Sequence, residues 1–479
     1  MKKKLVISVI CIVLTLSAAL VAFAACDKAG TTKVSSYSEL LSASGNVVLT
    51  ADIDCNYEPI NSFDFTSFDG QGFKIKNFVL KVTGAKDNAA FFGTDTRSIR
   101  NVTFDGVSVY GENVLALSVV KIGGGGYIEN VHVKNVKITA VQNQYLPCYV
   151  GAIYAGAYNA QLNRNTSYST SYNAQIVNCS ADKVSIEIEG NESPSTSGNS
   201  SPRLYAGVIA GACDNVSDSY AKNSTVTVTS NNSKSYPIVG GLVGYCTGIM
   251  ENCYAVDNVL NAYSKQDTNI GNATVSIGGL VGYASATNSS VRKIQYCYSD
   301  NNKLNASTNN NVYAGGLVGR LAEMQVGQCY AVKNVIDLQC SRYGLTYNAT
   351  RNACGLIGYA TSSVIVSSFA CDNDVTESAT TTSTKIAACG FAVVDDFTSV
   401  SYCGAANNKL EASTTDEFSH LPIANLYDCI VSSVTLGNVN ACQKLARSEW
   451  FKESTVKAKL KIGGPYWLFP STYFPALDF

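Results

Sequence analysis

A glycine-rich phrase recurs through the middle of the chain at a nearly constant interval. Its copies read Val-Gly-Gly-Leu-Val-Gly-Tyr, Ile-Gly-Gly-Leu-Val-Gly-Tyr, Ala-Gly-Gly-Leu-Val-Gly-Arg, Ala-Cys-Gly-Leu-Ile-Gly-Tyr and a shortened Ala-Cys-Gly-Phe. The second residue of each copy falls at position 240, 278, 315, 354 and 389, so successive copies are 35 to 39 residues apart. A repeat of this length indicates a stack of similar small units rather than one globular core.

Two further blocks follow the glycine-rich copies. The first reads Asn-Cys-Tyr-Ala at 252–255, Tyr-Cys-Tyr-Ser at 296–299 and Gln-Cys-Tyr-Ala at 328–331, and the second is typified by Asn-Val-Leu-Asn-Ala at 258–262. Each unit is therefore predicted to contain three short β-type segments separated by Gly, Asn and Ser turns. Helical repeats would need apolar residues three and four apart and much more Ala, Glu, Lys and Leu.

Stacking such units pairs each strand with its equivalent in the next coil and completes a continuous core. The sequence therefore predicts an all-β fold, a right-handed parallel β-helix over residues 35–412. We expect glycine to supply positive φ at the corners. Asparagine also tolerates left-handed corners, and stacked Asn amides can hydrogen-bond along the axis.

The glycine-rich phrase and the following Asn-Cys-Tyr-Ala resemble the GLUG repeat. That repeat occurs in large bacterial surface proteins, including adhesin-like proteins and regions beside an IgA-specific metallopeptidase domain. Residues 49–75 also resemble the opening coils of such β-helices. The resemblance covers about residues 35–412 and implies the fold, but a fold does not determine an activity.

Both ends of a parallel stack are open strand edges that need a cap. Ser36 and Glu39 form a capping-box pattern ahead of two leucines, which predicts a short N-terminal capping helix. Residues 413–479 lose the repeat, with a possible helix at 440–450 followed by aromatic residues. We expect this segment to be a mixed C-terminal cap lying across the last coil; the alternative is a terminal ligand-binding module.

The N-terminus resembles a bacterial lipoprotein signal. Three lysines precede an apolar run at residues 5–25, which ends in Phe23-Ala-Ala and Cys26. The resemblance implies that residues 1–25 are removed, that the Cys26 thiol is diacylated, and that residues 26–34 form a tether. Phe23 departs from the usual leucine. The alternative is an uncleaved membrane anchor, because the apolar run reaches spanning length. Both interpretations place the rest of the chain outside the cytoplasm; the first attaches it to the cell membrane by lipid, at the cell surface.

The charge balance narrows the choice of partners. The chain has 35 basic and 36 acidic residues, and charged residues make up only 15% of it. This composition argues against a nucleic-acid partner, which would need a basic surface. Only two histidines are present, so we expect neither a metal site nor a cofactor. In a stack of coils a column of like charges would repel itself, which accounts for the scarcity of charge.

Of the 17 cysteines, 15 remain when Cys11 in the signal and Cys26 are set aside. Several occupy equivalent repeat positions: Cys179, Cys253, Cys297 and Cys329 in one column, Cys354 and Cys389 in another. We expect inward-facing ladders of buried free thiols. Disulfides between neighbouring coils are the alternative, because equivalent residues lie roughly 4.8 Å apart.

An enzymatic function has little support in the sequence. His132 and His420 do not form a metallopeptidase motif. Polysaccharide lyases or hydrolases would need clustered carboxylates, often with a basic residue nearby. The acidic pairs available for this are Asp52/Asp54, Asp372/Asp374 and Asp395/Asp396. The low charge elsewhere gives no supporting ring of Arg or Lys, so we predict no catalytic residue and keep a polysaccharide-active enzyme as the alternative.

A binding function is suggested by insertions between the repeat blocks. Residues 159–175, 189–203, 262–274 and 341–352 are rich in Tyr, Asn, Ser and Thr and differ from copy to copy. Insertions at one place per coil gather on one face of a solenoid, and exposed tyrosine suits glycan or protein contacts. The candidate ligand contacts are Tyr168, Tyr172, Tyr205 and Tyr343. We predict adhesin-like binding of a glycan or of a protein on a host or neighbouring cell. The alternatives are plain solvated loops and a passive component of the envelope.

Overall fold

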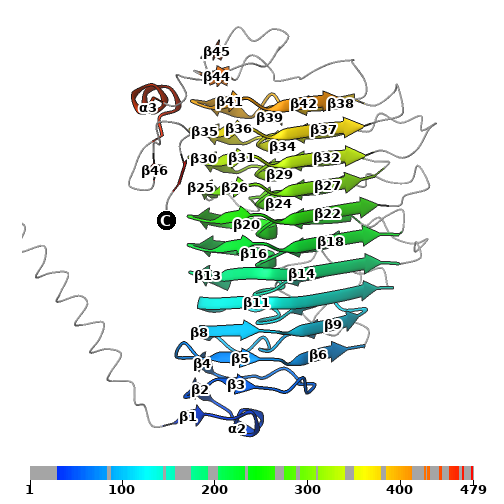
Figure 1. Cartoon of the computed structure of the whole chain (residues 1–479), viewed down its shortest axis with the longest axis vertical. Helices are drawn as coiled ribbons and strands as arrows, with labels where there is room; N and C mark the ends of the chain where they lie inside the picture. Colours follow the sequence, from blue (N-terminus) through cyan, green and yellow to red (C-terminus); the bar gives the residue numbers. More distant parts are fainter. Residues whose placement is uncertain are drawn as a thin grey trace, which may run out of the picture.

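The computed structural model describes residues 30–83, 88–143, 147–156, 174–191, 203–231, 236–264, 274–286, 292–308, 311–339, 350–378, 385–412, 426–427, 429–431, 442–444, 452–462, 467–468 and 476–477. In these residues the chain is a tall stack of parallel strands that rises in sequence order from the N-terminal coils (Figure 1). The fold is a parallel β-helix, as predicted. Cys26, Tyr168, Tyr172 and Tyr343 lie outside the described residues.

The strands form two long parallel sheets and one short hairpin. The smaller parallel sheet contains β7 (Asn88–Ala89), β10 (Ala116–Ser118), β12 (Cys148–Gly151), β15 (Arg203–Gly207), β19 (Tyr236–Gly240), β23 (Thr274–Gly278), β28 (Asn311–Gly315), β33 (Thr350–Cys354) and β38 (Lys385–Cys389). The N-terminal coils of the larger sheet contain β1 (Thr31–Val34), β2 (Asn46–Leu49), β3 (Ile53–Asp54), β4 (Ser67–Asp69), β5 (Lys74–Lys76), β6 (Val79–Val82), β8 (Ser98–Asp105), β9 (Ser108–Glu112) and β11 (Gly126–Gln142).

The later coils of the larger sheet are arranged in four columns. The first holds β16 (Ala210–Ser217), β20 (Val243–Glu251), β24 (Val281–Ser285), β29 (Val318–Ala322), β34 (Ile357–Thr361) and β39 (Ala392–Val394). The second holds β13 (Ala174–Val177), β25 (Lys293–Gln295), β30 (Gln325–Gly327), β35 (Val364–Val366), β40 (Ser399–Ser401) and β43 (Leu426–Tyr427). The third holds β17 (Tyr220–Lys222), β21 (Tyr254–Val256), β26 (Tyr298–Asp300), β31 (Tyr330–Val332), β36 (Phe369–Cys371), β41 (Gly404–Ala406), β44 (Cys429–Val431) and β45 (Cys442–Lys444). The fourth holds β14 (Ser180–Gly190), β18 (Thr225–Ser230), β22 (Val259–Ser264), β27 (Lys303–Ser307), β32 (Val335–Gln339), β37 (Asp374–Ser378) and β42 (Lys409–Ala412).

The coil is divided more finely than predicted. The coil at 311–339 contains five strands, β28 to β32, instead of three. The glycine-rich phrase itself supplies two of them, because a tight turn separates β28 from β29. Equivalent residues of the phrase are in register from coil to coil, so that Gly240 pairs with Gly278, Gly278 with Gly315 and Gly315 with Cys354. The period read from the sequence is therefore the rise of one coil.

The repeat glycines serve a different purpose from the one predicted. None of the described glycines of the phrase has a positive φ; that conformation falls instead on corner residues such as Asn252 (φ 54°) and Asp257 (φ 57°). The glycines are required by close packing, because a Cβ on Gly279 would overlap Gly316 O and Ser299 Oγ. The prediction of left-handed glycine corners is wrong here, whereas that of left-handed asparagine corners is confirmed.

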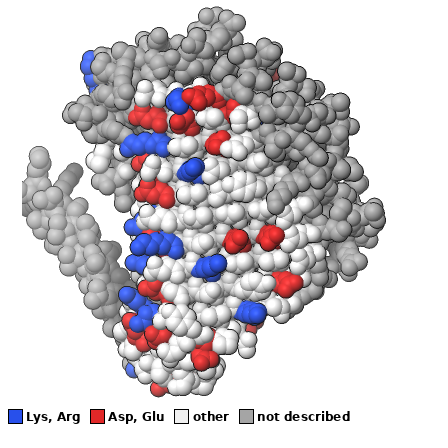
Figure 2. Space-filling model, turned by 45° about the vertical axis from the view of Figure 1, so that its right-hand side comes forward, with Lys and Arg blue, Asp and Glu red and all other residues white. Residues whose placement is uncertain are grey.

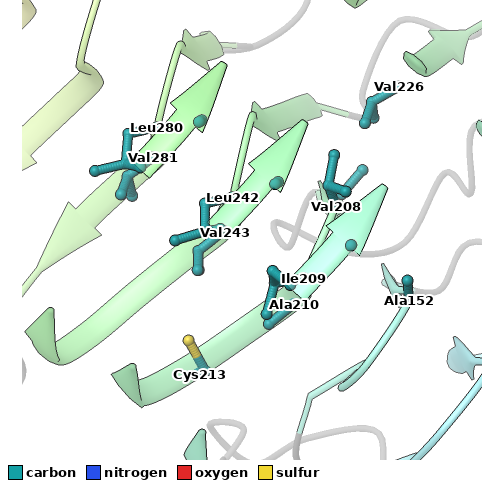
Figure 3. Close-up of a cluster of buried hydrophobic side chains, with 14 of the residues drawn as sticks. Ala152, Val208, Ile209, Ala210, Cys213, Val226, Leu242, Val243, Leu280 and Val281 are labelled. Atoms are coloured by element: carbon teal, nitrogen blue, oxygen red, sulfur yellow. The ribbon is translucent and has the colours of Figure 1, made fainter. Parts of the chain in front are cut away.

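The interior is filled by columns of aliphatic side chains. Figure 3 shows Leu242 with Val243 and Leu280 with Val281 on successive strands, and all four are fully buried. Burying such a side chain contributes about 1.5–3 kcal/mol. Every coil adds equivalent side chains to one continuous core, so each coil is stabilised by the coil below and by the coil above.

A ladder of buried asparagines closes one corner of the coil. The Oδ1 of Asn302 accepts from Asn258 N at 2.8 Å, and its Nδ2 donates to Ala255 O at 2.8 Å. Asn334 repeats the arrangement one coil higher, where its Oδ1 accepts from Asn302 N at 3.0 Å. The predicted hydrogen bonding of Asn amides along the axis is confirmed. The ladder satisfies backbone groups that the corner would otherwise leave buried and unpaired.

The cysteine column is a hydrogen-bond ladder of the same kind. The Sγ of Cys297 donates to Gln295 O at 3.2 Å, and Cys297 N donates to Cys329 Sγ at 3.4 Å. Ser219 and Ser368 hold the equivalent position in other coils and make the same bond to the carbonyl two residues before. All twelve cysteines whose side chains the structure describes are buried free thiols, as predicted.

The N-terminal cap is confirmed and the C-terminal prediction is corrected. Helix α2 (Tyr37–Ser42) begins after Ser36, whose Oγ accepts from Glu39 N at 3.3 Å. The predicted helix at 440–450 is wrong, because Cys442–Lys444 forms β45 and extends the parallel stack beside β44. The C-terminal helix is α3 (Glu453–Leu460), which lies beside the stack with β46 (Trp467–Leu468). The hairpin partner of β46 is β47 (Ala476–Leu477).

The described surface carries few charges. The face in Figure 2 is mostly uncharged; acidic and basic residues gather along its left edge, and a few others are scattered across it. Charged residues of neighbouring coils also form pairs, such as Lys293 Nζ with Glu251 Oε1 at 3.4 Å. Among the described residues, no helix has the length and apolar character needed to cross a membrane.

Candidate binding surface

Five aromatic residues form a stacked row on the outside of the third column of strands. This lateral ladder consists of Tyr220, Tyr254, Tyr298, Tyr330 and Phe369, which are in register on successive coils. Neighbouring ring centroids are 4.8 to 5.3 Å apart and neighbouring planes differ by 4° to 7°. The ring faces are used against each other, so the ladder presents ring edges and a row of hydroxyls. Burial raises the pKa of Tyr254 to about 12, so its hydroxyl is neutral and able to donate.

The C-terminal segment covers the upper part of the lateral ladder. The Trp467 ring centroid is 6.0 Å from those of Tyr330 and Phe369, and its Nε1 donates to Gln328 Oε1 at 3.3 Å. Leu460 and Leu477 are buried in the same cluster. The predicted cap therefore packs along the side of the coils in its described part. Tyr220, Tyr254 and Tyr298 lower in the ladder are half-buried.

A second aromatic row runs along the corner between the two parallel sheets. This corner ladder consists of Tyr149, Tyr205, Tyr245, Tyr283, Tyr313, Arg320 and Tyr359. Tyr205, one of the predicted contacts, is 5% exposed and stacks on Tyr149 at 4.7 Å. Its hydroxyl accepts from Arg203 at 3.3 Å. The structure therefore assigns Tyr205 to a packed row, and the other three predicted tyrosines lie outside the described residues.

Arg320 interrupts the corner ladder. It takes the place that tyrosine holds in neighbouring coils, since it pairs in register with Tyr283 on one side and Tyr359 on the other. Its guanidinium lies 5.0 Å from the centroid of the Tyr283 ring and 5.9 Å from that of Tyr313. Cation–π contacts of this kind hold a guanidinium in place while leaving its hydrogen-bond donors available.

The acidic pairs considered for catalysis hold the coils together. Asp54 accepts two hydrogen bonds at 3.1 Å from Asn77 Nδ2, and Asp372 accepts from Asn407 Nδ2. Asp395 accepts from the hydroxyls of Thr361 and Thr398, both at 2.6 Å. Hydrogen bonds from Asn56 N and Asn77 lower the pKa of Asp54. Burial acts to raise the pKa of Asp395, but the hydrogen bonds that its carboxylate accepts outweigh burial and lower the pKa. Both carboxylates are thus unsuited to act as general acids at neutral pH.

His132 also belongs to an inter-coil contact. Its Nδ1 is 2.7 Å from Ser180 Oγ on the next coil, and its Nε2 is 2.9 Å from Asn130 Oδ1. Ser180 is buried, and it is the register partner of both His132 and Tyr220. The hydroxyl and imidazole thus continue the lateral ladder toward the N-terminus. Burial lowers the pKa of His132, so the ring is neutral at pH 7.

Two buried charge clusters were not foreseen from the sequence. The Lys121 ammonium donates to the carbonyls of Gly93, Thr94 and Thr96 at 2.6 to 3.2 Å, and burial lowers its pKa to about 8. Inside the coil at 350–378, Arg351 Nη1 lies 3.9 Å from Glu377 Oε1. These two residues are 3% and 1% exposed. Burial raises the pKa of Glu377 to about 7.

The described residues contain no group of His, Cys, Asp and Glu that could hold a metal ion. Comparison with models of protein families finds none that matches this chain, and neither a curated protein nor a solved structure is significantly similar to it. The fold and its side-chain rows define the class: a parallel β-solenoid with stacked aromatic ladders on its outer surface. The resemblance to GLUG repeats stays a prediction.

Proposed function

We propose that this chain is a lipid-anchored protein of the bacterial cell surface that binds glycan or protein ligands in an adhesin-like manner. In this proposal residues 1–25 are a signal peptide, Cys26 carries the lipid, and the β-helix extends the binding surface away from the membrane. The repeat phrases that resemble GLUG repeats support a surface location. Charged residues make up only 15% of the chain, which suits a ligand held mainly by polar and aromatic contacts.

The observation that carries the proposal is the partly covered lateral ladder. Its upper rings already hold an extended segment, because Trp467 packs on Tyr330 and Phe369. Tyr254 and Tyr298 continue the same stack below, with their ring centroids 4.9 Å apart, against 5.3 Å between Tyr330 and Phe369. A row of ring edges and hydroxyls at a regular repeat suits an extended ligand that lies along the axis. The structural use of Asp54, Asp372 and Asp395 argues for binding rather than hydrolysis.

The proposal is tested by screening the purified full-length chain on a glycan array and on extracellular matrix proteins. For a ligand found in this way, Tyr254→Ala with Tyr298→Ala is expected to weaken binding at least tenfold. Tyr263→Ala is the matched control, because Tyr263 is half-buried in the same coil as Tyr254 but outside both ladders. Binding to no glycan and no matrix protein would overturn the proposal. Turnover on a panel of polysaccharides would favour the enzymatic alternative.

Anchoring is tested separately. Cells that express the chain are grown with labelled palmitate, and the label is expected on the wild-type protein and not on the Cys26→Ser variant. Cys55→Ser is the control, because Cys55 is a buried thiol of the β-helix. Label that persists in Cys26→Ser, or none in the wild type, would contradict lipid attachment at this residue.

A further inference from the structure

We infer that the corner ladder contains a site for the carboxylate of an acidic glycan, formed by Arg320, Tyr313 and Asn352. The inference rests on the proposed binding function and specifies its ligand class. Three features support it: a substitution in the ladder column, two hydrogen-bond donors without partners, and the absence of a counter-charge among the described residues.

Arginine holds this column position in one described coil, whereas the column begins with Ala212 beside Tyr245. Tyr245, Tyr283 and Tyr359 hold the position in neighbouring coils, and Arg320 replaces them between Tyr283 and Tyr359. Stacked tyrosines satisfy the ladder without introducing charge, whereas Arg320 introduces a cation that is held by the Tyr283 and Tyr313 rings and by no carboxylate of the described residues. Positions where a sequence departs from its own structural rule without compensation are expected at functional sites.

Two donors in this region lack acceptors. Arg320 Nε is buried and makes no hydrogen bond, and the same is true of Asn352 Nδ2 on a side chain that is 2% exposed. Asn352 is the register neighbour of Tyr313, whose ring lies 5.9 Å from the Arg320 guanidinium. A buried donor without a partner is unfavourable, because it has lost its hydrogen bonds to water. Both groups donate, so the partner that would relieve this cost is an acceptor.

No carboxylate of the described residues occupies that role. The ion pairs between described residues do not include Arg320. Asp395 acts on Tyr359, the register neighbour of Arg320: burial is the main cause that raises the pKa of Tyr359, and the charge of Asp395 is the second. Asp395 itself is already bonded to Thr361 and Thr398. Arg320 as a whole is half-buried, so part of its side chain faces solvent.

The surroundings favour a glycan over an acidic peptide. Tyr283, Tyr313 and Tyr359 line the site with rings and hydroxyls, which hydrogen-bond to sugar hydroxyls and pack against their C–H groups. The guanidinium fork binds a carboxylate through two parallel hydrogen bonds. The guanidinium matches the carboxylate of one uronic-acid unit, and the neighbouring tyrosines match the sugar ring that carries it.

The test compares oligogalacturonate with its fully methyl-esterified form by isothermal titration calorimetry of the full-length chain. The wild type is expected to bind the acid at least tenfold more tightly than the ester. Arg320→Tyr restores the residue that other coils use, so it should fold normally and bind the two forms equally. Asn352→Ala is expected to weaken binding of the acid about threefold. Lys303→Gln, at an exposed lysine of β27, is the control for general charge and is expected to change nothing.

The inference is overturned if the wild type does not prefer the acid, if Arg320→Tyr keeps the preference, or if Lys303→Gln loses it equally. Should Arg320→Tyr fail to fold, Arg320→Lys decides the matter, because it keeps the charge and removes the fork; an unchanged preference then contradicts the inference. Binding of neutral glycans or matrix proteins without a preference for the acid would refute this site and leave the proposed function standing. Absence of all binding would refute both.

Discussion

The coil at 274–307 and the coil at 350–378 share one backbone and differ in what they carry. In the first, the inward positions hold Val275 and Ala306, and the corner ladder holds Tyr283. In the second, the residues equivalent to Val275 and Ala306 are Arg351 and Glu377. Both are buried, and Arg351 Nη1 and Glu377 Oε1, which face each other, make no hydrogen bond. The repeated residues therefore build the stack, and three residues that depart from the repeat, Arg320, Arg351 and Glu377, lie in two adjacent coils, 311–339 and 350–378.

The largest effect is expected from breaking a repeated glycine. In Gly279→Ala the new Cβ overlaps Gly316 O of the next coil, which is backbone and unable to move alone. We expect a loss of about 4 kcal/mol or more, measured as the urea midpoint of unfolding. Gly327→Ala is the control, because its nearest atom would be Val366 Cγ1 at 3.3 Å. Equal losses for both variants would contradict the close-packing role.

The second-largest loss of stability is expected from breaking the asparagine ladder. Asn302→Ala removes the acceptor for Asn258 N and the donor for Ala255 O, both in the interior. Two unpaired backbone groups are expected to cost about 3 kcal/mol of unfolding free energy. Asn305→Ala removes an outer bond to Asn261 Oδ1 from a half-buried position and is expected to cost less than about 1 kcal/mol. If the two variants were equally stable, the inner ladder would not be what closes this corner.

Glu377 is expected to make the stability of the chain depend on pH. Burial raises the pKa of its carboxyl from 4.5 to about 7, against the opposing effect of Arg351. The folded chain therefore retains this proton at a pH where the unfolded chain has lost it, and the associated stability falls as pH rises from about 5 to 8. The loss is up to about 3 kcal/mol, and it should vanish in Glu377→Gln. Chemical unfolding at pH 5 and pH 8 measures it.

The control for this titration is Glu411→Gln, at an exposed glutamate of β42 in the next coil. Its pH dependence is expected to match that of the wild type. A pH profile of Glu377→Gln parallel to the wild type would show that the buried carboxyl is not the group that titrates.

The smallest effect is expected in the cysteine column. Cys297→Ser should change stability by less than about 1 kcal/mol, because Ser219 and Ser368 already make the equivalent bond. Cys297→Val keeps the apolar volume and removes the donor to Gln295 O, so it is expected to be the less stable variant. The reverse order would mean that the thiol acts only as a space-filling apolar group.

Much of the architecture was predictable because the repeat constrains register directly. The positions of the glycine phrase, the Asn302 corner and the Cys297 column follow from periodicity, and the structure confirms them. The role of Gly279 was not predictable, since close approach to Gly316 O exists only between coils. The helix expected at 440–450 failed because pairing with β44 overrides local propensity.

The candidate sites were less predictable for a related reason. The sequence next to Tyr205 predicts a ligand contact, but its ring stacks on that of Tyr149. Arg320 was visible in the sequence as the one arginine in a tyrosine column, and that departure was the signal available. Asn352 carries no such signal, because only the register with Tyr313 brings it to the same place.

The most direct test of the claim that Arg320, an exception to the repeat, selects an acidic ligand is an exchange of ladder residues. The preference for oligogalacturonate over its methyl ester is measured in Arg320→Tyr and in Tyr283→Arg, which moves an arginine one coil down the same column. We predict that Arg320→Tyr loses the preference and that the chain carrying both changes does not regain it, because Ser276, not Tyr313, is the sheet neighbour in that coil. An intact preference in Arg320→Tyr would contradict the claim.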